Sequence, residues 1–200
     1  MIILIDGYNF LKTVTGSKHI EERVMLDWIN IFDQYSGLRS NQVIIVFDAG
    51  PVLFEAAHQQ GRVTVMYAGQ YQTADDLLKK WLLKHREKDV LLVSSDREVR
   101  DYAQQMGIVS LASLDFNKIF NDVLQHAQYD QDSLAHTLHK TMQQQDPSAL
   151  DQSLDVLMEL GTRNLVSGFK KQEYSSDLRV RDGKKASKAD KLVMKKVQKI

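Results

Sequence analysis

The amino-acid sequence predicts an α/β protein with a central parallel sheet of about five strands. Short apolar runs alternate along the chain with longer segments in which apolar residues recur at helical spacing. Several of these runs are unbroken stretches of β-branched residues or Leu, which is typical of strands buried on both faces. Strands that alternate with helices form a parallel sheet with crossover helices on its faces.

Five apolar runs are the predicted strands: Ile2–Ile5, Val43–Phe47, Val63–Tyr67, Val90–Val93 and Ile108–Leu111. We expect the first of them to be the central strand. The segment between the second and third runs has no comparable pattern. We interpret that segment as a short helix with a turn at Gln60-Gly61.

Helices are predicted where apolar residues recur at steps of three and four. Three such faces lie between the strands: Val24, Trp28, Ile31, Phe32 and Tyr35; Leu77, Leu78, Trp81 and Leu82; Val99, Tyr102, Ala103 and Met106. Two more follow the last strand: Phe116, Ile119, Phe120, Val123 and Leu124; Leu154, Leu157, Met158 and Leu160. The C-terminal region is therefore expected to be helical, and beyond residue 170 only Ala189–Ile200 has helical potential.

We expect three parts: a domain over residues 1–125, a helical extension over 126–168, and a basic tail over 169–200 that is partly disordered or helical. The formal charge of the chain is zero, but Gly168–Ile200 holds eleven Lys or Arg against four Asp or Glu, a net charge of +7. Such a tail suits a polyanionic partner, and the alternative is a solvated extension. We expect it to bury little apolar surface.

Composition excludes several classes of protein. The chain has no Cys, which rules out disulfides and thiolate metal sites and indicates a reducing compartment. The N-terminal apolar run is too short to span a membrane and has no basic segment before it, so we expect a cytoplasmic protein with no membrane partner. The six His residues show no zinc spacing, and neither a P-loop nor a GxSxG motif is present. The oligomeric state does not follow from the sequence.

Polar residues follow four of the predicted elements at the point where ligands bind in open parallel sheets. Asp6 and Asn9 follow the first strand, Asp48 follows the second, and Asp96 follows the fourth. Thr73-Ala74-Asp75-Asp76 opens the helix after the third strand. Several carboxylates in one crevice repel one another unless a cation lies among them, and no Lys or Arg is near Asp6 or Asp48 in sequence.

Helix capping separates these carboxylates further. Thr73-x-x-Asp76 and Ser95-x-x-Glu98 both fit the capping box, in which a hydroxyl and an acid close the start of a helix. The same hydroxyls of Thr73 and Ser95 could instead bond a phosphate. We therefore expect the metal ligands to be Asp6, Asp48, Asp75 and Asp96, with Asn9 as a neutral contact. Hard oxygen ligands suit Mg²⁺ or Mn²⁺, and the chemistry that such a site supports is phosphodiester hydrolysis.

Four motifs occur in an order that resembles a known family. They are "LIDGYNFL" at Leu4–Leu11, "VFDAG" around Phe47, "TADDLLKKWL" at Thr73–Leu82 and "LLVSSDREVRDYA" at Leu91–Ala103. Together they resemble the NYN domain of the YacP type, a branch of the PIN-like nuclease superfamily. The resemblance covers about residues 1 to 125.

This resemblance implies a three-layer α/β/α fold and a metal-dependent ribonuclease that binds Mg²⁺ or Mn²⁺. It assigns catalysis to Asp6, Asp75 and Asp96, matches Asn9 to a first-strand position, and places Asp48 at the "FDA" position. Members of the family are linked to RNA cleavage, in some cases on ribosomes. It therefore also implies RNA as partner, including mRNA or rRNA on the ribosome, and endonucleolytic cleavage.

An acidic crevice needs basic flanks to attract RNA. The candidate phosphate contacts are Arg97, Lys80 and Lys84 on the predicted helices and Lys184 and Lys185 in the tail. For the helical lysines the alternative is a solvated outer face. Tyr8, Tyr67 and Tyr71 could stack on bases, and the alternative for them is packing or loop anchoring.

Two other classes of function are open at this point. A phosphatase of the aspartyl-phosphate kind would need a second Asp two residues after Asp6, where the sequence has Tyr8. A non-catalytic RNA- or ribosome-binding adaptor would need only the basic tail, with a degenerate acidic site. Metal-dependent RNA cleavage distinguishes the nuclease from both.

Overall fold

The computed structural model describes residues 1–48, 53–127 and 188–200. One compact unit comprises Met1–Val123 and Lys185–Ile200, and Leu124–Lys184 forms a second unit. The predicted stripe at residues 154–160 lies outside the described residues, so the helical extension over 126–168 stays a prediction. Within the described ranges, no helix is long and apolar enough to cross a membrane.

Six strands form one mixed sheet in the order β3-β4-β2-β1-β5-β6. Their bounds are β1 Ile2–Asp6, β2 Gln42–Phe47, β3 Ala56–Gln60, β4 Val63–Tyr67, β5 Val90–Val93 and β6 Val109–Leu111. All neighbouring strands pair in parallel except β3 and β4, which are antiparallel. The first apolar run is therefore the central strand, as predicted, and it lies between β2 and β5.

The prediction of a helix before Val63 is wrong, because this segment forms the edge strand β3. Gly61 and Arg62 connect β3 to β4 in a tight hairpin in which Gln60 pairs with Val63. Gly61 has a φ of 60°, and a side chain there would also meet the carboxylate of Asp33. The sequence of β3 has no apolar alternation, because most of this strand is exposed and backbone pairing holds it in place.

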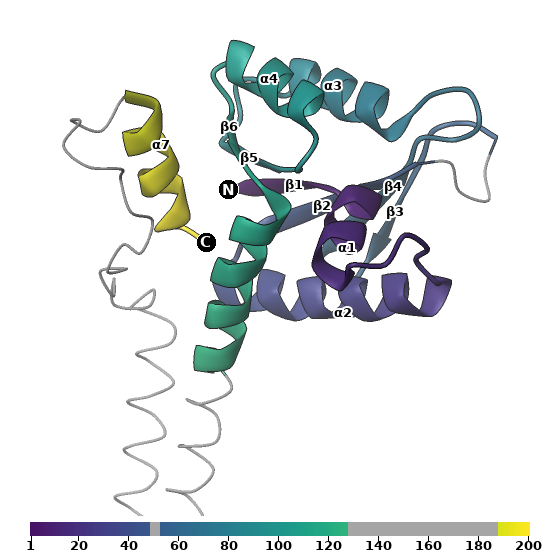
Figure 1. Ribbon diagram of the computed structural model, residues 1–200, viewed down its shortest axis with the longest axis horizontal. Coiled ribbons are helices and arrows are strands. Elements are labelled where there is room, and N and C mark those ends of the chain that lie inside the picture. The colour runs from purple at the N-terminus through teal and green to yellow at the C-terminus, as the bar shows by residue number, and fades with distance from the viewer. Residues whose placement is uncertain (49–52, 128–187) are drawn as a thin grey trace, which may run out of the picture. The chain divides into compact units, whose positions relative to one another are not determined.

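Helices cover both faces of the sheet (Figure 1). The helices α1 (Gly7–Thr15) and α2 (Glu22–Arg39) lie on one face, and α3 (Ala74–Lys84) and α4 (Arg97–Gln105) lie on the other. A further helix begins at residue 113 and continues to residue 127, the end of that described range. The three-layer α/β/α arrangement is thus confirmed. The sequence pattern had not indicated α1, whose buried face is only Gly7, Phe10 and Leu11.

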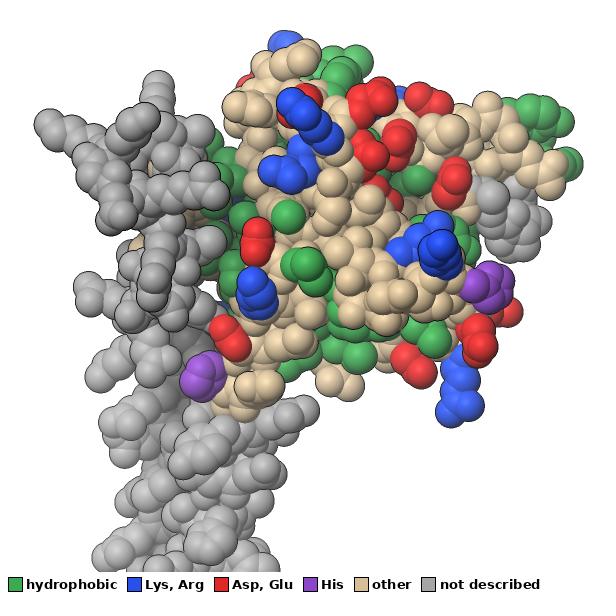
Figure 2. Space-filling model, viewed as in Figure 1, with side chains coloured by type: hydrophobic (Ala, Val, Ile, Leu, Met, Phe, Trp, Pro, Cys, Tyr) green, Lys and Arg blue, Asp and Glu red, His purple; other side chains and the backbone are tan. Residues whose placement is uncertain are grey.

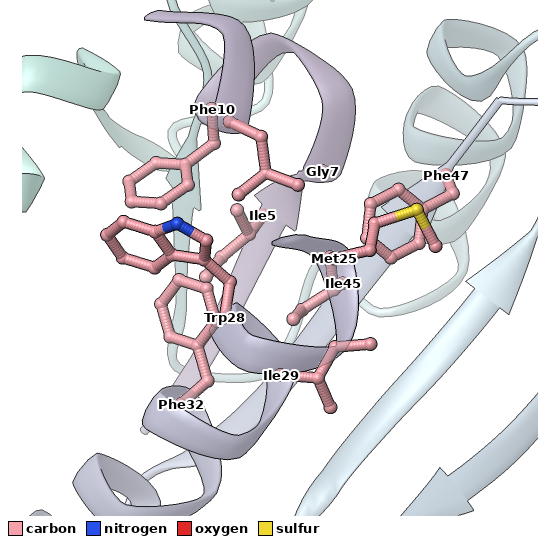
Figure 3. A pocket seen from close by; sticks show the side chains of 10 residues that line it. Ile5, Gly7, Phe10, Met25, Trp28, Ile29, Phe32, Ile45 and Phe47 are labelled. Atoms are coloured by element: carbon pink, nitrogen blue, oxygen red, sulfur yellow. The ribbon is translucent and has the colours of Figure 1, made fainter. Parts of the chain in front are cut away.

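An aromatic cluster fills the layer between α1, α2, the helix from residue 113 and the sheet. The rings of Phe10, Trp28 and Phe32 contact one another, and Phe120 packs against Trp28 and Phe32. Figure 3 shows the first three of these rings beside Ile5 of β1. The hollow that they line leaves no room for a water molecule, so it is a packing gap and not a ligand pocket.

The opposite layer is mainly aliphatic, and it also contains the Trp81 ring. Leu77, Leu78 and Leu82 of α3 and Val99 and Ala103 of α4 are almost fully buried against the other face of the central strands. These residues belong to the helical faces predicted from the sequence. Covering β1, β2 and β5 on both sides explains why those strands are continuous apolar runs.

The end of the chain packs against the domain. In α7 (Lys188–Val197) and the residues after it, Val197 is 7% exposed and Ile200 is 2% exposed. Lys196 and Lys199 form ion pairs with Asp89, at 3.0 Å and 2.7 Å, just before β5. The expectation that the tail buries little apolar surface is therefore wrong for its last residues, although a helix in this part of the tail was predicted.

The docked end also reaches the start of β2. The Asn41 side chain donates to the carbonyl oxygen of Lys199 at 3.2 Å, and the Tyr35 hydroxyl donates to the carbonyl oxygen of Ile200 at 3.2 Å. Asn41 and Asp89 precede their strands, so this contact lies at the amino ends of the parallel strands. The candidate site lies at the other end of these strands, where their carboxyl ends are.

Candidate active site

The candidate site lies at the carboxyl ends of β1 and β5, which are neighbours in the sheet. The chain leaves β1 into α1 on one face and leaves β5 toward α4 on the other, so the two connections diverge. A crevice outside diverging connections is the usual ligand site of an open α/β sheet. The residues delivered there are Asp6 from β1 and Ser94 to Asp96 after β5.

Asp6 is the buried carboxylate of this edge, with 6% of its surface exposed. It is the N-cap of α1, accepting from the Asn9 backbone at 3.4 Å, and its Oδ2 accepts from the Ser94 hydroxyl at 3.0 Å. Burial raises the pKa of Asp6 to about 6; the two hydrogen bonds oppose the rise, and the charges of Asp75 and Asp96 add to it. A charged Asp6 is thus costly unless a cation compensates it.

Gly7 is required for α1 to begin immediately after Asp6. A Cβ at this position would lie 2.5 Å from the Phe47 ring and 2.9 Å from the Val46 carbonyl oxygen. The structure assigns its role to close packing against β2, because its φ is not positive.

Asp96 is linked to Asp6 through Ser94. The fully buried Ser94 hydroxyl donates to Asp6 and accepts from the Asp96 N–H at 3.0 Å. Asp96 is itself the N-cap of α4: its Oδ1 accepts from the backbone of Glu98 at 2.7 Å and of Val99 at 3.2 Å. The prediction that Ser95 and Glu98 cap this helix is therefore wrong by one residue, since the N-cap is Asp96. Asp96 both caps α4 and contributes a carboxylate to the acidic edge.

Asp48 and Asp75 come to the same edge from β2 and α3. Asp48 accepts from the Ala74 N–H at 3.0 Å, which ties the end of β2 to the first turn of α3. Thr73 and Asp76 form the predicted capping box, so this prediction is confirmed. Asp75 is half-buried; burial and then the carboxylate of Asp96 raise its pKa, and Asp48 contributes in the same direction.

Hydrogen bonds around Asn9 join the start of α1 to the loop after β5 and to the helix from residue 113. The side-chain oxygen of Asn9 accepts from the Ser95 N–H at 2.9 Å and from the Ser113 hydroxyl at 3.2 Å. The Ser95 hydroxyl in turn accepts from the Ser113 N–H at 3.1 Å, at the start of the next helix. Asn9 and Ser95 thus have structural partners here. Ser113 had no sequence signal, because its role depends on a contact 104 residues away.

Two further charged residues, Lys79 and Glu98, interact with each other at this edge, and neither was among the predicted site residues. Lys79 pairs with Glu98, and the two have opposite effects on Asp75: Lys79 lowers its pKa and Glu98 raises it. Lys79 lies four residues after Asp75 on α3, which places both side chains on one helix face. Carboxylates still outnumber this cation, and Figure 2 shows acidic side chains gathered beside α3 and α4.

This edge presents carboxylate oxygens, which are the ligands that a hard divalent cation prefers. Among the described residues, however, no three His, Asp or Glu side chains are grouped so as to hold a metal ion by themselves. Mg²⁺ commonly uses only one or two carboxylates and completes its shell with water and substrate phosphate. The residues therefore fit an ion shared with a substrate rather than one enclosed by protein.

The predicted phosphate contacts have different surroundings. Arg97 is 92% exposed at its side chain and lies 3.6 Å from Asp101. Lys80 pairs with Glu55 at 2.6 Å, and Lys84 is exposed one turn further along α3. Lys184 and Lys185 lie outside the described residues.

The three tyrosines proposed to stack on bases also differ in their surroundings. Tyr8 packs on the Phe47 ring and Tyr67 lies between Phe47 and His58, so these two anchor loops and strands. Tyr71 is 76% exposed.

An α/β/α sandwich with carboxylates at the carboxyl ends of its parallel strands is the arrangement of PIN-like nucleases. The family model described as "YacP-like NYN domain" matches residues 3–156, and the chain belongs to this family. The match extends beyond residue 125, where the resemblance seen in the sequence ends. A comparison with curated proteins finds no match.

Solved structures support the same fold. The chain is similar to Rae1 (YacP) from Bacillus subtilis, in a mutant form with 18% identity and a TM-score of 0.53, covering 84% of this chain and 100% of that one. A second Rae1 structure shows 17% identity and a TM-score of 0.53, covering 83% and 95%. At this identity the likeness concerns the fold alone.

Proposed function

We propose that this protein is a metal-dependent ribonuclease that cleaves RNA endonucleolytically in the cytoplasm. Mg²⁺ or Mn²⁺ would be held by one or two carboxylates from among Asp6, Asp48, Asp75 and Asp96, with water and substrate phosphate completing its shell. Catalysis would depend on Asp6, Asp75 and Asp96. The observation that supports the proposal is the link between Asp6 and Asp96 through Ser94, with Asp75 close enough to perturb Asp6.

The chain's own residues have definable roles in such a reaction. When bound, a divalent ion would supply an activated water and neutralise charge on the phosphate. Ser94 orients Asp6 by donating to Oδ2, and it holds the Asp96 backbone in position by accepting its N–H. Asn9 and Ser113 fix the loop that carries Ser95 and Asp96. The site is thus preorganised on the ends of β1 and β5.

The test is cleavage of single-stranded RNA by the full chain in Mn²⁺ and in EDTA. We expect cleavage only with the metal, and its loss by at least a hundredfold in Asp6→Asn and in Asp96→Asn. Asp27→Asn is the matched control, since Asp27 is an exposed aspartate of α2 on the other face of the sheet. Activity that survives either site substitution would contradict the assignment, and no cleavage of any RNA would favour the adaptor.

A further inference from the structure

Two exposed aromatic side chains lie beside each other on the loops that follow β2 and β4. Phe54 is 71% exposed and Tyr71 is 76% exposed, and their ring centroids are 5.6 Å apart with the planes inclined at 33°. Leu53, the residue before Phe54, is also 53% exposed. Figure 2 shows exposed apolar side chains at the right-hand end of the visible face. Such rings on a protein surface mark a candidate binding site.

The aromatic pair is held in place by the backbones of both loops. The Gln70 N–H donates to the Leu53 carbonyl oxygen at 3.0 Å. Gly69 has a φ of 80°, and a Cβ there would lie 2.7 Å from the Phe54 carbonyl carbon, so only glycine permits this approach. The pair is therefore preorganised, which lowers the entropic cost of binding a ligand.

Cationic side chains flank the pair. Glu55, next to Phe54, accepts from Lys80 at 2.6 Å and from the Gln72 amide at 3.4 Å. Lys84 lies one turn after Lys80 on α3, and the charges of both lower the pKa of Glu55. The Lys80 side chain remains 63% exposed. Lys80 and Lys84 beside the two rings suit a ligand that combines a flat apolar group with negative charge.

The pair adjoins the acidic edge. Tyr71 precedes Asp75 by four residues, so their Cα atoms lie within about 14 Å. The Asp48 bond to Ala74 joins the end of β2 to the same turn of α3. A strand of nucleic acid that places a phosphate at the carboxylates can therefore reach the rings within a few nucleotides.

We propose that Phe54 and Tyr71 form a stacking platform for an unpaired base of single-stranded RNA, with Lys80 and Lys84 contacting the RNA backbone. The choice of RNA rests on the proposed ribonuclease function. Every base has a π face that stacks on aromatic side chains, and flanking cations attract the backbone. A protein partner would need a larger apolar surface than these three side chains present.

The test measures binding in EDTA, where metal-dependent cleavage does not interfere. A labelled single-stranded RNA of about 12 nucleotides is titrated with the full chain, and binding is followed by fluorescence anisotropy. We expect Phe54→Ala and Tyr71→Ala each to weaken binding about tenfold, whereas Phe54→Tyr and Tyr71→Phe keep it. Leu83→Ala is the matched control, because Leu83 is a 55% exposed apolar residue of α3 outside the pair. Binding of duplex RNA, whose bases are already stacked, should change little.

Three outcomes would overturn the proposal: no binding of RNA by the wild type, equal affinity of the alanine variants, or equal loss for duplex RNA. If the wild type instead self-associates and the alanine variants do not, with RNA affinity unchanged, the patch covers a second copy of the chain and the proposal also fails. Cleavage in Mn²⁺ is scored separately. RNA binding that depends on the two rings, without cleavage, would contradict the ribonuclease function and support the stacking platform. Cleavage without ring-dependent binding would support the ribonuclease function and contradict the platform.

Discussion

Replacing Asp6 with Asn should abolish the proposed activity and at the same time stabilise the fold. Asp6 is almost completely buried, and its carboxylate lies near those of Asp75 and Asp96. Asn is nearly isosteric, carries no charge, and is as good an N-cap for α1 as Asp. The substitution therefore removes the cost of the charge and keeps most of the local structure.

The size of the effect follows from the pKa. Burial raises the pKa of Asp6 from 3.8 to about 6. Each pH unit of such a difference is worth about 1.4 kcal/mol, so the charged form costs the folded state about 3 kcal/mol. The weaker hydrogen bond from Ser94 to the amide offsets about 1 kcal/mol. We expect Asp6→Asn to raise the free energy of unfolding by about 2 kcal/mol above pH 7.

The pH dependence has a definite sign. Between pH 4 and 6 the folded protein binds a proton at Asp6 that the unfolded chain does not, so wild-type stability falls as pH rises through this window. Asn does not titrate. The gain of the variant should therefore be small at pH 4 and complete above about pH 7.

Urea unfolding in EDTA, followed by circular dichroism at several pH values, measures this difference. Asp76→Asn is the matched control of opposite sign, because hydrogen bonds from Thr73 lower the pKa of Asp76. That variant should lose stability at pH 7 and not at low pH. A destabilised Asp6→Asn protein at pH 8, or a gain that is the same at pH 4.5 and pH 8, would refute the reasoning.

Two further predictions concern the packing around the site and the docked end of the chain. Gly7→Ala should destabilise the fold by about 1–3 kcal/mol in urea unfolding, because the added Cβ meets Phe47 and the backbone of β2. Gly37→Ala, within α2 and facing only the flexible end of Arg62, should be neutral or stabilising by up to about 1 kcal/mol, and equal losses would contradict the packing argument. Asp89→Asn should loosen α7 and cost about 1 kcal/mol at pH 7, since it removes the partner of Lys196 and Lys199. Bonds from Lys199 and then Lys196 lower the pKa of Asp89 to about 2, so this contribution is present above about pH 4 and is lost as pH falls toward 2. The rate of limited proteolysis within residues 188–200, compared between wild type and variant at pH 7 and near pH 2, checks this prediction. An unchanged cleavage rate in the variant at pH 7 would show that the ion pairs do not hold α7 in place.

The parallel strands and their helices could be predicted because each is encoded locally. Val63–Tyr67 and Val90–Val93 have the bounds that their apolar runs indicate, and β1 is central. Their apolar continuity reflects burial on both faces, which is visible without any knowledge of the partners. The edge strand β3 lacks this signal, since solvent covers much of it and its partner is β4.

The candidate site could be predicted only in outline. Strand ends and the capping box of Thr73 and Asp76 are local, and they identified the carboxylates. Sequence spacing could not decide whether Ser95 or Asp96 caps α4, because either hydroxyl or carboxylate can bond the first turn and the loop path decides between them. It also gave no indication that Ser94 joins two of the carboxylates, or that Phe54 and Tyr71 meet.

The sequence by itself determined the fold class, the family motifs and the residues that carry charge at the ends of the strands, since each depends on neighbours within a few positions. The tertiary structure decided which of these residues meet. The burial that raises the pKa of Asp6, the Ser94 link and the docking of Ile200 beside Tyr35 all join segments far apart in the chain. Contacts of that kind depend on how the layers pack, and no local pattern encodes them.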